Sequence, residues 1–62
     1  MQLCKLVGNY EVVVRNDEDW LFKTEVYDAT NHALLESSKG WSTPEHAQEA
    51  GIVSAQTLFV TS

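Results

Sequence analysis

The strongest constraint on the fold is a helix start signal that directly follows strand-like residues. Ser42 and Glu45 form a Ser-x-x-Glu capping box, and Thr43 before Pro44 matches the preference for an N-cap residue followed by proline. Small and apolar residues then recur at helical spacing: Ala47, Ala50, Gly51, Ser54 and Leu58. Residues 20–27 instead alternate with a period of two, which is typical of a half-buried strand. The second half of the chain therefore predicts a sheet followed by one helix.

The alternation in residues 20–27 also predicts which side chains the sheet buries. Trp20, Phe22, Thr24 and Val26 share one face of the expected strand. Large aromatic side chains contribute most to a small core, so we expect Trp20 and Phe22 to anchor it.

The remaining segments complete the expected sheet. Residues 3–15 favour extended structure, and Gly8-Asn9 within them indicates a bulge or an entry turn. Residues 33–37 form a short third strand, and residues 38–41 link it to the helix. We expect either Leu34 or Leu35 to face the core. The sequence does not decide between them, because a one-residue slip in the strand register exchanges them. Asn31 is the residue expected to be left-handed in the turn before this strand.

These segments together predict one domain spanning residues 1–62, of the α+β class. Its expected architecture is a three-stranded antiparallel sheet with one C-terminal helix packed on one face, in the order β-β-β-α. Ile52, Ala55 and Phe59 form a second apolar stripe on the helix. One small sheet is not expected to cover both stripes, so the helix predicts a second contact surface.

The chain has 62 residues, and a domain of this size is usually supported by disulfides, a metal or a partner. Cys4 is the only cysteine, so an internal disulfide is excluded. His32, His46 and Cys4 lack the paired spacing of a structural zinc site. We therefore expect no metal and no cofactor, and we expect the chain to associate with a second copy.

The net charge of −5 excludes the basic surface that binding to a nucleic-acid backbone requires. Four cationic residues are spread singly along the chain: Lys5, Arg15, Lys23 and Lys39. The sequence also lacks an apolar run of the length that a membrane span needs. Its expected location is the cytoplasm.

Several of these features together resemble a repeat of the YegP-like family of small proteins of unknown function. The matching pieces are Trp20 and Phe22, the turn at 28–32, residues 34–38, Trp41-Ser42-Thr43, and Ala47 with Ala50-Gly51-Ile52. His32 stands where the family turn usually has glycine, and the lysines frequent in the family helix are absent. The resemblance implies a β-β-β-α unit that occurs in tandem pairs or as a homodimer, and it implies no known activity.

The chain offers little for catalysis. His32 and His46 would need to converge on a pocket with an orienting partner, and the sequence does not place them together. Cys4 is not accompanied by the histidine and asparagine pattern of a cysteine nucleophile. We therefore predict a protein that is not an enzyme. If the protein were an enzyme, its active site would have to be a cleft between two subunits, with His32 or His46 facing it.

The favoured hypothesis is a homodimeric protein-interaction module. Its dimer would form through the outer sheet face or by pairing edge strands, with contacts at Val13, Leu21, Tyr27 and Trp41. The alternative is an acidic inhibitor from a phage or mobile element, which binds a basic cleft of a host nucleic-acid-processing protein. Its contact residues would be Asp17, Glu18 and Asp19, in a turn rich in carboxylates.

Overall fold

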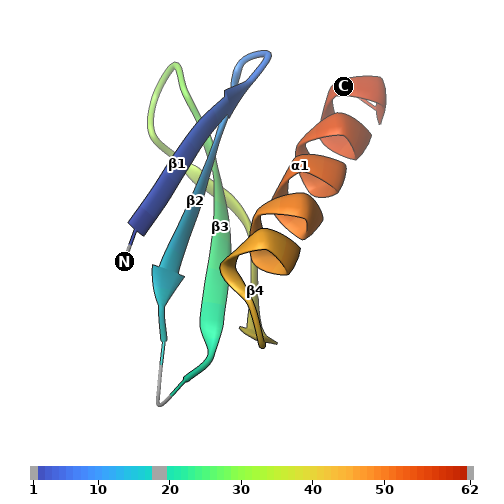
Figure 1. The fold of residues 1–62 in the computed structure, drawn as a ribbon. Coiled ribbons are helices and arrows are strands. Elements are labelled where there is room, and N and C mark those ends of the chain that lie inside the picture. The colour runs from blue at the N-terminus through green and yellow to red at the C-terminus, as the bar shows by residue number, and fades with distance from the viewer. Residues whose placement is uncertain (1, 18–19, 62) are drawn as a thin grey trace.

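The protein folds into two layers, a four-stranded antiparallel sheet and one helix that crosses a single face of it (Figure 1). The computed structural model describes residues 2–17 and 20–61. Each strand pairs with its neighbour in the chain, so the order across the sheet is β1-β2-β3-β4. The elements are β1 (Gln2–Val7), β2 (Tyr10–Asn16), β3 (Phe22–Asp28), β4 (Leu34–Trp41) and α1 (Pro44–Thr61). The α+β class and the C-terminal helix are confirmed.

The prediction of three strands is wrong, because residues 3–15 form a hairpin rather than one interrupted strand. Val7 pairs with Tyr10, which leaves Gly8 and Asn9 as a two-residue loop. Gly8 has a φ of +61°, and glycine at the first loop position is the requirement of a type II′ hairpin turn. The supposed bulge is therefore the turn that creates a fourth strand.

The last strand is longer than predicted, since residues 38–41 continue β4 and do not form a linker. The pairing of β4 with β3 is interrupted by two register shifts. At these shifts, Leu35 and Gly40 have no directly opposed partner on β3. Gly40 has a φ of +88°, which glycine adopts at little steric cost in a bulge. Leu34 and Leu35 are both exposed, so neither faces the core as expected.

The core consists of small and β-branched side chains rather than aromatic ones. Its buried members between the sheet and the helix are Val12, Val14, Thr24, Val26, Ala47 and Ala55, and Val13 is buried on the opposite face of the sheet. Thr24 and Val26 are buried as predicted, and Phe22 is half-buried. Trp20 is 88% exposed, so its predicted role as a core anchor is wrong. It precedes β3 in the connection from β2, where the alternation of the strand no longer applies.

The stripe of small residues on α1, which includes Ala47 and Gly51, explains why no aromatic ring fits beneath the helix. A Cβ atom on Gly51 would collide with Val12 and Thr24, so these side chains already touch the helix backbone. The Thr24 hydroxyl, buried at this contact, donates a 2.6 Å hydrogen bond to the carbonyl of Ala47. The helix packs mainly on β2 and β3, and it leaves the edge strands less covered.

The turn between β3 and β4 is closed by local hydrogen bonds. The Asp28 and Asn31 side chains accept hydrogen bonds from the backbone N–H groups of Thr30 (2.8 Å) and Ala33 (2.9 Å). The left-handed residue is His32, with a φ of +60°, and not Asn31 as predicted. Asn31 uses its side chain to form the turn, and the chain reverses at the next residue.

Candidate functional site

An open groove of about 560 Å³ lies between β4 and α1. Its floor and walls include Ser38, Trp41, His46, Glu49, Val53 and Ser54. We call this feature the β4–α1 groove. It exists because α1 packs mainly on β2 and β3, so the helix covers the side chains of the last strand less completely.

Two local structures hold the residues of the groove in place. Thr43 is the N-cap of α1, because its hydroxyl accepts a hydrogen bond from the His46 N–H at 3.2 Å. This confirms the predicted helix start. The indole N–H of Trp41 donates to the Ser38 hydroxyl at 3.0 Å, which fixes the ring along the strand. Trp41 pairs with Phe22 and so faces the helix side, because the extra residue Gly40 shifts the register by one.

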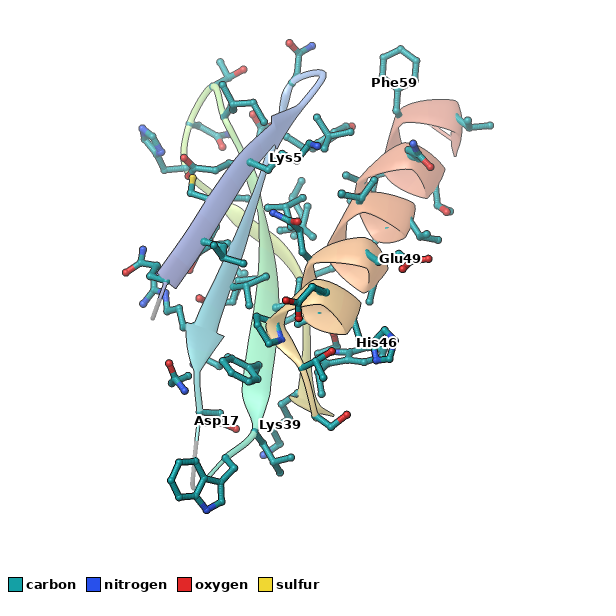
Figure 2. All side chains as sticks on the ribbon, in the orientation of Figure 1. Lys5, Asp17, Lys39, His46, Glu49 and Phe59 are labelled. Carbon is teal, nitrogen blue, oxygen red and sulfur yellow. The ribbon has the colours of Figure 1, made fainter. Side chains whose placement is uncertain are left out.

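The groove carries acidic charge. Glu49 lies on its helix wall, and His46 lies one turn earlier on the same side of α1 (Figure 2). Glu36 pairs with the buried Val26, so it stands on the helix side of β4, beside Ser38 and Ser54. Neither lysine nor arginine is among the described residues that line this region. Within a chain of net charge −5, the groove is therefore suited to cations rather than anions.

The opposite face of the sheet is covered by its own side chains. Val13 is only 4% exposed, although α1 packs on the other face of the sheet. Arg15 Nε lies 3.3 Å from Oε1 of Glu25, and this ion pair spans β2 and β3 beside Val13. Partial loss of solvent and the neighbouring Glu25 carboxylate raise the pKa of Tyr27.

The four predicted interface residues are not gathered on one surface. Val13 and Tyr27 lie on the outer face, and Leu21 precedes β3 in the connection from β2. Trp41 lies on the helix side, in the β4–α1 groove. A contact role for these residues stays a prediction, but one flat interface cannot include both Trp41 and the outer-face pair.

Of the three predicted contact residues in the acidic turn, only Asp17 lies within the described residues. Asp17 is half-buried, and its N–H donates to the Leu21 carbonyl at 2.9 Å. Glu18 and Asp19 lie outside the described residues. Asp17 shares a depression of about 410 Å³ with Lys23 and Lys39, so cations lie at the same end of the sheet (Figure 2). Binding of a basic partner by this turn stays a prediction.

The histidines lie at opposite ends of β4. His32 precedes the strand, His46 follows it in the first turn of α1, and both are exposed. Within residues 2–17 and 20–61, no three His, Cys, Asp or Glu side chains are arranged to hold a metal ion. Over the same residues, the structure contains no helix with the length and hydropathy of a membrane span.

Cys4 is exposed on β1, and its thiol donates a 3.2 Å hydrogen bond to Oε2 of Glu11. This hydrogen bond is the main cause of a raised pKa of the Cys4 thiol, and burial and the negative charge of Glu11 add to it. A raised pKa means less thiolate at a given pH. The thiol is therefore less reactive than its exposure alone would indicate.

Replacing Glu11 with glutamine should increase the reactivity of Cys4. The variant removes the charge that opposes the thiolate, so the pH midpoint for modification by a disulfide reagent should fall. The second-order rate at pH 8 should rise several-fold, measured with a chromogenic aromatic disulfide. Glu45→Gln, on α1, is the matched control and should leave the rate unchanged. An unchanged rate in Glu11→Gln would show that the carboxylate does not hold the thiol.

A second surface is apolar and lies on the C-terminal half of α1. Val53, Phe59 and Val60 are 55%, 62% and 80% exposed, and Figure 2 shows Phe59 projecting from the end of the helix. Glu49 is the last charged residue, so residues 50–61 of the helix carry no charged side chain. We call Val53, Gln56, Thr57 and Val60 the uncharged helix face, since they follow the i, i+3, i+4, i+7 spacing of one helix side.

Part of this surface was predictable. The stripe that includes Ile52, Ala55 and Phe59 indicated a second contact surface, although Ala55 is fully buried against the sheet. Phe59 of this stripe is exposed, and so are Val53 and Val60, which the stripe did not include. The signal that identifies them is the absence of charge after Glu49, because exposed helix faces normally carry charged residues.

Comparison with known proteins gives no relative from which a function could be transferred: no family model, curated protein or solved structure matches the chain. The resemblance to the YegP-like family stays an expectation from sequence.

Proposed function

We propose that the chain is a non-enzymatic protein-interaction module that forms a homodimer through the uncharged helix face. The observation that carries the proposal is the exposure of Val53, Phe59 and Val60 on a helix segment without charged residues. An apolar surface of this kind in a small domain marks an interaction site. Depletion of charge is also the compositional feature of interface centres.

A second copy is the partner that this surface fits best. In a two-fold dimer the same patch contacts itself, so each charged group at the centre would meet an identical charge. The uncharged helix face avoids this repulsion, although the whole chain has a net charge of −5. Two helices that present valines at i and i+7 can pack side by side, with Gln56 and Thr57 between them.

The test is a paired lysine substitution, Val53→Lys with Val60→Lys. Both side chains point outward, so the monomer should keep its fold, and cations near a helix C-terminus interact favourably with its dipole. In the dimer, however, the ammonium groups would be desolvated without partners. The dissociation constant should rise at least about 100-fold, equivalent to roughly 3 kcal/mol. Sedimentation velocity should find twice the chain mass of 7.0 kDa for the parent and the chain mass for the variant.

The matched control is Gln2→Lys with Thr30→Lys, which adds the same charge at exposed positions away from α1. It should remain dimeric. A parent that sediments at the chain mass at high concentration would contradict the proposal. The dimer could instead persist in the variant with both lysine substitutions and dissociate with Leu21→Ala or Tyr27→Ala. This result would support the outer-face interface predicted from the sequence.

A further inference from the structure

The free edge of β4 is the least covered part of the sheet. Seven of its eight residues are exposed, and it pairs only with β3 among the described strands. An edge strand presents a row of backbone N–H and C=O groups that another extended chain can pair with. Proteins that bind peptides by strand addition obtain affinity from these backbone hydrogen bonds and specificity from adjacent pockets for side chains.

The β4–α1 groove is such a pocket, because it lies beside this edge on the helix side. Successive side chains of an added strand point to opposite faces. Every second side chain of a peptide paired with β4 would therefore point toward the groove wall formed by His46, Glu49 and Val53. The groove has a volume of about 560 Å³ and is open to solvent, so a side chain of an added strand has space in it.

The chemistry of the groove selects a cation. The Trp41 indole offers an aromatic face, and its ring is held by the hydrogen bond to Ser38. Glu49 on α1 lines the groove together with the ring, and Glu36 stands further along β4, in a neighbouring depression that also contains Ser38. An ammonium or guanidinium group is attracted both to an aromatic face and to carboxylates. We propose that β4 binds an extended basic peptide as a fifth strand, with one lysine or arginine side chain in the groove beside Trp41 and Glu49.

The other edge of the sheet does not offer the same site. The helix side of β1 carries Lys5, which is exposed and would repel a basic peptide (Figure 2). Lys39 on β4 pairs with Lys23 and so stands on the opposite face from the groove. A basic peptide is the partner that this site gives to the proposed interaction module. The uncharged helix face meets the groove only at Val53, so peptide binding at the β4 edge does not require the dimer.

The experiment titrates the ¹⁵N-labelled chain, carrying Trp20→Phe, with a blocked heptapeptide of alternating threonine and lysine. Trp20 is exposed, and its removal leaves Trp41 as the sole tryptophan. Saturable shifts of the β4 amides and the Trp41 indole N–H are expected, together with a change in Trp41 fluorescence. The same peptide with glutamate in place of lysine should not bind. A lysine peptide methylated on alternate backbone nitrogens should bind at least tenfold more weakly.

Removing the carboxylates should weaken binding without disturbing the fold, since Glu36 and Glu49 are both exposed. Glu36→Gln with Glu49→Gln should raise the dissociation constant about tenfold, and Glu45→Gln, outside the groove, should change it less than twofold. Equal binding of the glutamate peptide, or an unchanged constant in the double variant, would overturn the proposal. It would also be overturned if the β4 amides shift with protein concentration alone, because a second copy would then occupy the edge. The dimer proposed above is measured separately, by sedimentation mass.

Discussion

Replacing Gly51 with alanine should destabilise the fold by about 2 kcal/mol, although the same change in an exposed helix interior stabilises by roughly 1 kcal/mol. The added Cβ atom would lie 2.5 Å from Cγ2 of Thr24, and closer still to Cγ1 of Val12. Both neighbours are buried and β-branched, so they have few alternative rotamers. The helix would have to lift away from β2 and β3. Urea denaturation should show a lower midpoint, and the melting temperature should fall by about 10 °C.

A second substitution tests the cause of this effect. Val12→Ala removes the nearest obstructing methyl group, so the double variant should be less destabilised than the sum of the two single variants. A coupling of at least about 1 kcal/mol is expected for residues in direct contact. An alanine at position 51 that leaves stability unchanged, or raises it, would show that the helix does not approach the sheet this closely.

The close approach of the helix was predictable from the sequence, but only some of the side chains beneath it were. The stripe that includes Ala47 and Gly51 consists mostly of small residues, and a stripe of this kind allows the helix backbone to lie near the sheet. Alternation also assigned Thr24 and Val26 to the buried face correctly. It failed at Trp20, because it assumed that the strand begins there. The hydrogen bond from the Asp17 N–H to the Leu21 carbonyl closes the chain reversal just before β3.

The number of strands depended on two residues. Gly8-Asn9 can interrupt a strand or reverse it, and the outcome is decided by whether the flanking segments find each other as partners. Glycine at the first loop position favours the hairpin. The fourth strand was therefore available as an alternative interpretation of the same residues. Tertiary pairing of residues 2–7 with residues 10–15 decided it.

The β4–α1 groove could not be predicted from the sequence, because its shape depends on the bulge at Gly40 in β4. If Gly40 paired regularly with Phe22 and formed no bulge, Trp41 would lie opposite the residue before Phe22 and would face the outer side of the sheet. The bulge moves it to the helix side, next to Glu49 of a later element. A single sequence shows that glycine is present, but not that the register changes there. The Thr43 N-cap, by contrast, is local and was predicted from four consecutive residues.

The hydrogen bond from Thr24 to α1 makes a further stability prediction. Its hydroxyl lies 2.6 Å from the Ala47 carbonyl and is buried, so Thr24→Val removes the donor while keeping the shape of the side chain. A methyl group cannot approach a carbonyl oxygen this closely, so the helix must also move outward. The variant should lose about 1.5–2 kcal/mol of unfolding free energy, measured by urea denaturation with an unchanged m-value.

Thr24→Ser is the matched control, because it keeps the donor and loses only the methyl group that faces Gly51. It should cost about 1 kcal/mol, so valine should be the more damaging of the two. The two variants should also differ at the β4–α1 groove. Thr24 ties the N-terminal half of α1 to β3, and this half supplies the His46 and Glu49 wall opposite Trp41. Trp41 fluorescence in a Trp20→Phe background should therefore change with valine and not with serine. If both variants are equally stable and leave the emission unchanged, packing alone holds the helix and the groove in place.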